Sequence, residues 1–247
     1  MLLDHFHPPV SDIRGWEGFR IWWAVNLAEH LNQYLVPPWH AEPHEHFGVA
    51  IYRVKLYRDF LEPPGGFPHP GGHHPGPPQM TVSLPKPSDT AEVPMPPLEG
   101  EREIIGVVNF VSPANKDQPQ HREEFVRECQ SLLHQGIGVV VVDIVTLHGA
   151  NLHVDLLEKL GAIPPDDTAD LYAAAYHPIK RGAETFVEVW YKPLTTGNEV
   201  TLPPIVLFLR DGPSLLIDVK GIYHRACKQA RIFRDLKFIE TLRQQME

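Results

Sequence analysis

The chain has 247 residues, of which 43% are hydrophobic, and a formal net charge of −9 with histidine neutral. This length suits one large domain or a domain with a long arm, and the apolar content can form a sizeable core. A uniformly acidic surface repels a phosphate backbone, so nucleic-acid binding would need a local basic patch. The nearest basic stretch, residues 220–234, spreads five Lys and Arg residues over a helical pattern, which favours a solvated helix face.

The two cysteines, Cys129 and Cys227, each lie in an apolar helical pattern. This setting predicts buried free thiols in a reducing compartment, with a disulfide between them as the alternative. The sequence contains no apolar run of about 18 residues, the length of a membrane span. The N-terminus lacks the charged and then apolar pattern of a signal peptide. These features predict a cytoplasmic protein without a membrane partner.

The N-terminal region predicts one long helix between extended segments. Residues 1–13 are expected to be extended, because His7-Pro8-Pro9 opposes a helix. From Trp16 to Tyr34, large apolar side chains recur every three or four residues, which predicts an amphipathic helix. Pro37-Pro38 ends it. Residues 47–57 then develop an alternating pattern that predicts a strand.

Residues 63–97 contain twelve prolines and many glycines. Proline cannot donate to a sheet ladder and breaks a helix, so this density opposes any packed element. We expect an exposed loop, polyproline-like in places, that separates two strands of one domain. The elements on either side are too small to fold alone.

The middle of the chain predicts a strand, a helix and a second strand. The apolar, β-branched run from Ile104 to Val111 predicts the first strand, and residues 120–135 predict a helix that ends at Gly136. Gly138 to Val145 is a continuous apolar run, which is typical of a central strand buried on both faces. Asn151 is expected to cap a short helix that ends at Gly161.

The last third predicts two hairpins followed by two helices, near residues 220–231 and 234–245. The hairpins pair residues 171–177 with 185–191, and residues 205–209 with 215–219. The whole order predicts an α+β fold in which helices pack on a mixed sheet. We expect a single domain over residues 1–247, with a core at about 14–160 and a hairpin and helix extension at about 165–247.

The early order of helix, strand, strand, helix and buried strand is that of metal-dependent nucleases of the PD-(D/E)XK type. These restriction-endonuclease-like proteins need an acid on each of the first two strands and a lysine nearby. The carboxylates hold Mg²⁺, a hard cation that prefers oxygen ligands. The metal polarises the phosphodiester and lowers the pKa of a bound water, while the lysine offsets charge or orients that water.

Short motifs along nearly the whole chain resemble those of one bacterial family. The motifs are Asp4 to Pro9, Ala41 to Gly48, Ser112 to Asp117, Val142 to Thr146, Ala150 to His153, Leu171 to Pro178 and Leu202 to Ile205. The chain is thereby similar to the domain of unknown function 4058 family, whose core resembles that of Uma2-type restriction-endonuclease-like proteins. The motifs are specific for family membership but weak for function, because the family has no established activity.

The resemblance implies four chemical groups that this chain lacks. It leads us to expect acids at positions 50 and 52, a glutamate at 109 and a lysine at 128; the chain has Ala50, Tyr52, Asn109 and Glu128. Asn109 retains a neutral carbonyl ligand, Tyr52 cannot replace a carboxylate toward Mg²⁺, and Glu128 reverses the sign of the lysine. We therefore expect a vestigial site.

Two other residues are weak catalytic candidates. Lys116 could stand in for the missing lysine, although a solvated turn lysine is the favoured interpretation. Asp143 lies in an apolar strand and must be paired or hydrogen-bonded. It could be a site acid at the strand end, or it could equally cap a neighbouring turn.

Histidines offer a weak metal candidate. His40, His44 and His46 lie within seven residues, and an H-x-H pattern on a strand turns both rings to one face. His44 and His46 are thus candidate ligands for Zn²⁺ or a similar metal. No cysteine or acidic residue completes a tetrahedral spacing, so exposed histidines are the favoured interpretation here and in the proline-rich segment.

The sequence therefore predicts a catalytically inactive nuclease-like fold that acts as a binding or scaffolding module, without a cofactor and with a homodimer as one assembly. The alternative is an active Mg²⁺-dependent phosphodiesterase or nuclease whose acids come from Glu42, Glu45 or Asp143. Only this alternative calls for Mg²⁺ and a nucleic acid. Carboxylates that converge near Asn109 would favour the enzyme, and a site filled by Tyr52 and apolar side chains would favour the module.

Overall fold

The computed structural model describes residues 1–46, 51–59, 72–73, 75–85, 102–197 and 202–246. The helices are α1 (Val10–Ile13), α2 (Trp16–Asn32), α3 (Pro113–Lys116), α4 (Pro119–His134), α5 (Leu152–Lys159), α6 (Val219–Gln229) and α7 (Ile232–Met246). The strands are β1 (Trp39–His46), β2 (Ile51–Asp59), β3 (Met80–Ser83), β4 (Arg102–Phe110), β5 (Gly138–Asp143), β6 (Leu171–Arg181), β7 (Glu184–Leu194), β8 (Ile205–Phe208) and β9 (Ser214–Ile217).

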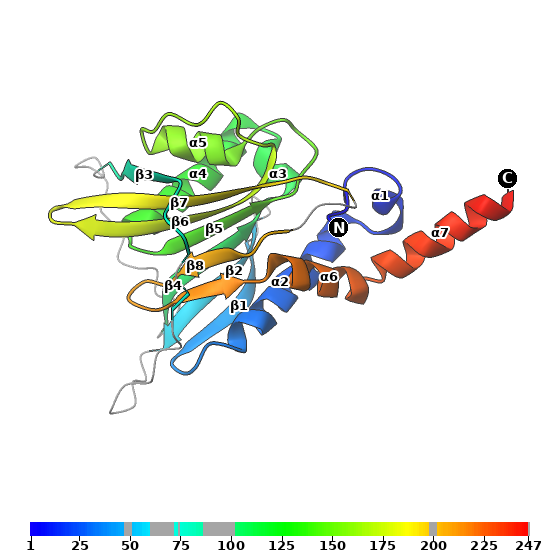
Figure 1. Cartoon of the computed structure of the whole chain (residues 1–247), viewed down its shortest axis with the longest axis horizontal. Helices are drawn as coiled ribbons and strands as arrows, with labels where there is room; N and C mark the ends of the chain where they lie inside the picture. The colour runs from blue at the N-terminus through cyan, green and yellow to red at the C-terminus, as the bar shows by residue number, and fades with distance from the viewer. Residues whose placement is uncertain (47–50, 60–71, 74, 86–101, 198–201, 247) are drawn as a thin grey trace.

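Seven strands form one mixed sheet in the order β1-β2-β4-β5-β6-β7-β3, and β8 pairs with β9 in a separate two-stranded sheet (Figure 1). Within the large sheet, only β4 and β5 are parallel neighbours. Parallel neighbours need a crossover connection, which the segment containing α3 and α4 supplies. The protein is therefore an α+β protein with a mixed sheet flanked by helices, as the order of elements predicted.

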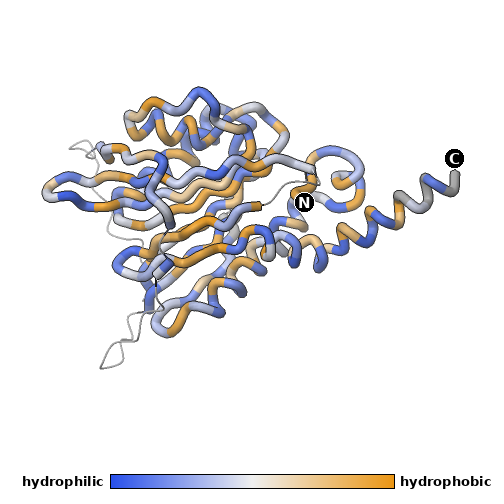
Figure 2. The backbone as a smooth tube through the Cα atoms, in the orientation of Figure 1, coloured by the Kyte–Doolittle hydropathy of each residue, from blue (hydrophilic) through white to orange (hydrophobic). Residues whose placement is uncertain are grey.

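Both faces of the sheet are covered. On one face α2 packs on β1 and β2 beside α6, and β8 contacts β4, β5 and β6; on the other, α4 packs on β5 and β6 beside α5 (Figure 1). Hydrophobic residues recur along the central strands (Figure 2). All six residues of β5 are buried; Val140 and Val142 belong to the core on the α2 side, and Val139 and Val141 to the core on the α4 side. The predicted central strand is confirmed.

Several element ends follow from single residues. Gly136 ends α4 with a φ of +79°, a conformation that favours glycine, and Asn151 caps α5 by accepting hydrogen bonds from two backbone N–H groups of its first turn. Gly138 is needed for close packing, because a Cβ there would lie 2.0 Å from the carbonyl oxygen of Phe208. The missing side chain lets β8 pack directly on the start of β5.

The predicted hairpins and C-terminal helices are also confirmed, as β6–β7, β8–β9, α6 and α7. Cys129 and Cys227 are buried and free, so the prediction of free thiols is confirmed and the disulfide alternative is wrong. Burial raises the pKa of each thiol to about 12. Among the described residues, no helix has the length and apolar character needed to cross a membrane.

Two predictions for the N-terminal part are corrected. Residues 1–13 are not wholly extended, because α1 forms directly after Pro9, whose fixed φ is compatible with a helix start. The sequence analysis also missed β1, an edge strand that pairs with β2. Its polar residues face those of β2, and Pro43 is tolerated because an edge strand needs fewer backbone donors. Of the strand predicted at 47–57, residues 47–50 lie outside the described residues.

The proline-rich segment holds a strand, which the prediction of an exposed loop excluded. Within residues 63–97 the structure describes 72–73 and 75–85, and β3 there pairs antiparallel with β7. Val82 and Leu84 are buried in the core beside α4 and α5. The stretch from Met80 to Leu84 contains no proline, so its backbone can donate to a ladder. The remainder of 63–97 lies outside the described residues.

Candidate functional site

Three of the residues expected to carry chemistry, His44, Asn109 and Glu128, lie on the α4 side of the sheet, where β1, β2 and β4 are neighbours. The strand register places His44 opposite Arg53, and Arg53 opposite Asn109. Residues that are opposite each other across neighbouring strands share a face of the sheet. Tyr52 is paired with Phe110 instead, so the register leaves Tyr52 out of this row.

Arg53 and Glu128 form the central ion pair of this face. The Arg53 side chain is only 5% exposed, and its guanidinium makes a two-pronged contact with the Glu128 carboxylate of α4. In this contact Nη1 approaches Oε1, and Nη2 lies 2.8 Å from Oε2. Two parallel charge-assisted hydrogen bonds fix both side chains, and a buried guanidinium requires such a partner.

Asn109 lies beneath this pair and is 1% exposed. Its Nδ2 is 3.7 Å from the sulfur of Cys129. Within the described part of the chain, its Oδ1 has no hydrogen-bond partner. Burial raises the pKa of the Cys129 thiol to about 12, so the thiol is protonated at neutral pH and packs in the core beside Phe125 and Leu132.

A half-exposed polar rim borders the ion pair along β1. Glu42 Oε1 lies 2.8 Å from Arg102 Nη1 and 3.3 Å from His40 Nε2, while Glu42 Oε2 lies 3.6 Å from His44 Nε2. The Tyr57 hydroxyl is 2.5 Å from His44 Nε2, and the Arg102 guanidinium lies over the Tyr57 ring. Glu42 thus bridges two histidines and an arginine.

The predicted metal ligands occupy this rim only in part. His44 contacts Tyr57 and Glu42, and the side chain of His46 lies outside the described residues. Among the described residues, the structure contains no group of three or more His, Cys, Asp or Glu side chains arranged to hold a metal. The pairing of His44 with His46 around a metal stays a prediction.

Lys116 and Asp143 form a second ion pair on the same face, at the end of β5. Lys116 Nζ lies 3.1 Å from Asp143 Oδ2 and 3.3 Å from the carbonyl oxygen of Val145, and both side chains are fully buried. The favoured interpretation of Lys116 as a solvated turn lysine is therefore wrong. A capping box between Ser112 and Asn115 begins α3 and positions the lysine.

Of the two roles that the sequence left open for Asp143, the structure shows the capping of a neighbouring turn, and the role as a site acid stays a prediction. It pairs with Lys116, and its Oδ1 accepts a 2.9 Å hydrogen bond from the backbone N–H of Val145. Burial raises the pKa of the Asp143 carboxyl to about 6, against the opposing effects of the Lys116 ammonium and the Val145 N–H. The carboxylates of Glu42, Glu128 and Asp143 therefore each have an Arg or Lys partner.

Sequence reasoning did not single out Arg53, the residue that organises the site. The local signal was weak, because a polar residue two positions before Lys55 fits an ordinary half-exposed strand. Only the register with Asn109 and the crossing of α4 reveal that Arg53 is buried. Comparisons with family models, curated proteins and solved structures return no match for this chain.

Proposed function

We propose that the protein is a catalytically inactive member of the restriction-endonuclease-like group and acts as a binding or scaffolding module. The order α2, β2, β4, α4, β5 agrees with the core expected for such proteins, with Asn109 on β4 and Glu128 on α4. On this proposal the chain is also a member of the domain of unknown function 4058 family, and its site is a vestige of a metal centre.

The observation that carries the proposal is the ion pair between the buried Arg53 and the partly exposed Glu128, on the same face of the sheet as the buried Asn109. Mg²⁺ requires about six oxygen ligands, several of them carboxylates. Here the Arg53 guanidinium already neutralises the Glu128 carboxylate, so a fixed positive charge stands beside Asn109, where a metal would need free oxygen ligands. Such a pair stabilises the fold without supplying a Lewis acid or a site for activated water.

The enzyme alternative draws on Glu42, Glu45 and Asp143. Glu42 is already engaged by Arg102, Asp143 is enclosed with Lys116, and the side chain of Glu45 lies outside the described residues. These features favour the module.

The half-exposed rim of His40, Glu42, His44 and Arg102 is the surface that we propose for ligand binding. These side chains present two imidazoles, a carboxylate and a guanidinium on one edge of the sheet. Such groups recognise polar partners, and an exposed polar rim beside a rigid sheet is a common setting for binding residues.

The test is a cleavage and metal-binding experiment on the full chain. Purified protein with Mg²⁺ or Mn²⁺ should leave plasmid and single-stranded DNA uncut. Calorimetry should detect no Mn²⁺ binding at this site, that is, no binding that is lost in the variants Asn109→Ala or Glu128→Gln. The control variants Asp143→Asn and Lys116→Met should behave as the unaltered chain does. Reproducible cleavage that disappears in Asp143→Asn or Lys116→Met would contradict the proposal and support the enzyme.

A further inference from the structure

The second helix of the chain is apolar on its outer side as well as on its inner side. Its inner side buries Phe19, Trp23 and Leu27 in the core. On its outer side, however, Ile21 is 49% exposed and Trp22 is 43% exposed. Val25 follows Ile21 by one helical turn and is 41% exposed, so the three side chains form one patch. A helix that is apolar all round is normally covered all round, and this patch on α2 is a candidate interface.

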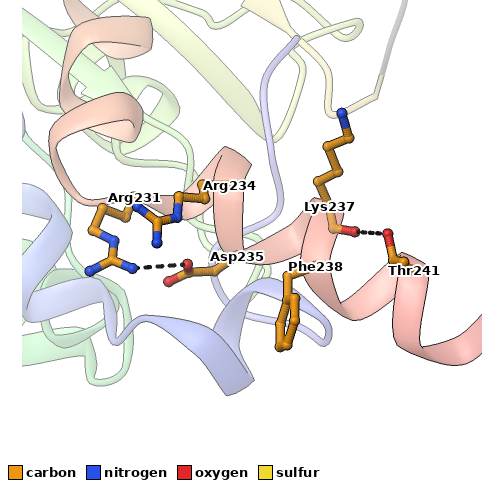
Figure 3. Close-up of a pocket in the computed structure, with 6 residues that line it drawn as sticks. All are labelled: Arg231, Arg234, Asp235, Lys237, Phe238 and Thr241. Carbon is orange, nitrogen blue, oxygen red and sulfur yellow. Dashed lines mark hydrogen bonds and ion pairs between the residues drawn. The ribbon is translucent and has the colours of Figure 1, made fainter.

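The last helix provides a second surface of the same kind. Its first residue, Ile232, is buried in the core, and the helix then projects away from the body (Figure 1). On its outer side Phe238 is 63% exposed. The ring borders a hollow whose other lining residues are Arg231, Arg234, Asp235, Lys237 and Thr241 (Figure 3). An exposed aromatic beside a hollow is a typical anchor point for a partner side chain.

The charges of the two surfaces are opposite. Residues 232–246 of α7 contain three Lys and Arg and two acidic residues, a net charge of +1, and Arg231 directly before the helix adds a further positive charge. On α2 the exposed charged side chains are Glu17, which is ion-paired with the buried Arg20, and Glu29. The apolar patch of α2 is thus bordered by the negative charge of Glu29, and Phe238 of α7 by three basic residues and one acidic residue.

We propose that the chain forms a two-fold symmetric dimer in which α7 of each copy lies on the outer face of α2 of the other. Trp22 of one copy fills the hollow beside Phe238 of its partner copy, and Arg234 and Lys237 meet the acidic flank of α2. The occupant is a second copy because each chain carries both complementary surfaces, the outer face of α2 and the Phe238 side of α7. In a two-fold symmetric dimer, α7 of each copy contacts α2 of the other, so the same contact forms twice. This inference does not depend on the proposed function.

The first test is sedimentation velocity on the full chain, whose mass is 28.0 kDa. The expected species has twice this mass, and its dissociation should increase at high salt, which screens the paired charges. Because a central tryptophan commonly dominates an interface, Trp22→Asp and Phe238→Asp should each weaken self-association by about 30-fold or more. Ile163→Asp is the matched control, since Ile163 is 90% exposed on a different part of the surface and should leave the dimer intact.

Mixing the two variants tests the exchange itself. A dimer of Trp22→Asp with Phe238→Asp keeps one intact α7–α2 contact, whereas either variant alone keeps none. The mixture should therefore associate more strongly than either variant alone, with circular dichroism verifying that both remain folded. A chain that stays monomeric at about 100 μM, well above the range of stable dimers, would overturn the proposal. So would a dimer that resists both substitutions, or a mixture that shows no rescue.

Discussion

Arg53 and Glu128 carry opposite charges but differ in the exposed fraction of their side chains, and this difference predicts how each substitution affects stability. The Arg53 side chain is 5% exposed and that of Glu128 is 36% exposed. Glu128→Leu leaves a buried guanidinium without its partner, which should cost about 3–5 kcal/mol in the free energy of unfolding. Arg53→Met leaves a carboxylate that water can still reach, so it should cost less.

Urea denaturation of the two single variants and of the double variant Arg53→Met/Glu128→Leu measures these costs. The double variant should recover much of the loss from Glu128→Leu, because no unpaired charge remains. Arg127→Met, which breaks an exposed pair with Glu123 on the same helix, is the control and should cost less than about 1 kcal/mol. A larger loss for Arg53→Met than for Glu128→Leu would contradict this description.

Asp143 predicts a component of stability that falls as pH rises. The pKa of its carboxyl is about 6 in the folded chain, mainly through burial, and about 3.9 in an unfolded chain. Between these values the folded state binds more protons than the unfolded state, so the contribution is full below about pH 4 and declines toward about pH 6. Above that pH the carboxylate is charged in both states and the decline stops.

Equilibrium unfolding at several pH values tests this contribution. Asp143→Asn should remove it, so the stability of the unaltered chain relative to this variant should decrease from about pH 4 to about pH 6. Lys116→Met should instead enlarge the decrease of stability with pH, because the Lys116 ammonium opposes the rise in the pKa of Asp143 and its removal lets that pKa rise further. A stability difference between the chain and Asp143→Asn that is constant with pH would exclude a raised pKa at this position.

At the scale of elements, both faces of β5 are buried and contribute to the core. Val140 contributes to the core on the α2 side and Val141 to the core on the α4 side. Truncation of either valine to alanine should cost about 1–3 kcal/mol through lost apolar burial and a cavity. The exposed Ile163→Ala is the control and should change stability little. A urea melt in which only one of the two valines matters would contradict burial on both faces.

The elements with strong local patterns could be predicted from the sequence, and those fixed by distant partners could not. The helical period of the large apolar residues in α2 predicts its buried side, and the continuous apolar run of β5 predicts a strand that is buried on both faces. In β1 the polar residues alternate with Trp39, Ala41 and Pro43, and this short segment with its proline becomes a strand because β2 supplies the ladder. The four residues of β3 lie among prolines and likewise depend on β7 for their pairing. Local composition carries no information on such partners.

The same limit applies to the candidate site. The resemblance identified Asn109 and Glu128, and the structure brings both to one place. Their shared partner, Arg53, follows from the register between β2 and β4, which includes a shift at Leu56 and Tyr57. A shift of one residue turns a side chain to the opposite face, so no count along the chain could choose Arg53 over Tyr52.

At the scale of the whole molecule, the C-terminal hairpin and α6 belong to the central core. Leu207 of β8 and Tyr223 of α6 are fully buried in the same cluster as Trp23 of α2 and Val140 of β5. β8 also lies so close to the sheet that a side chain at Gly138 would collide with its backbone. The early and late halves of the sequence therefore complete one another's core.

This shared core predicts a sharp difference between two truncations. A chain that ends at residue 201 loses β8, β9 and α6, exposes the inner face of α2, and should not unfold cooperatively in urea. A chain that ends at Lys237 loses only the projecting part of α7, so its free energy of unfolding should stay within about 1 kcal/mol of the full chain. Both are measured at low protein concentration, so that self-association adds nothing to stability. A cooperative melt of residues 1–201 would show instead that the sheet and α2 form an independent unit, with the C-terminal elements as an accessory layer.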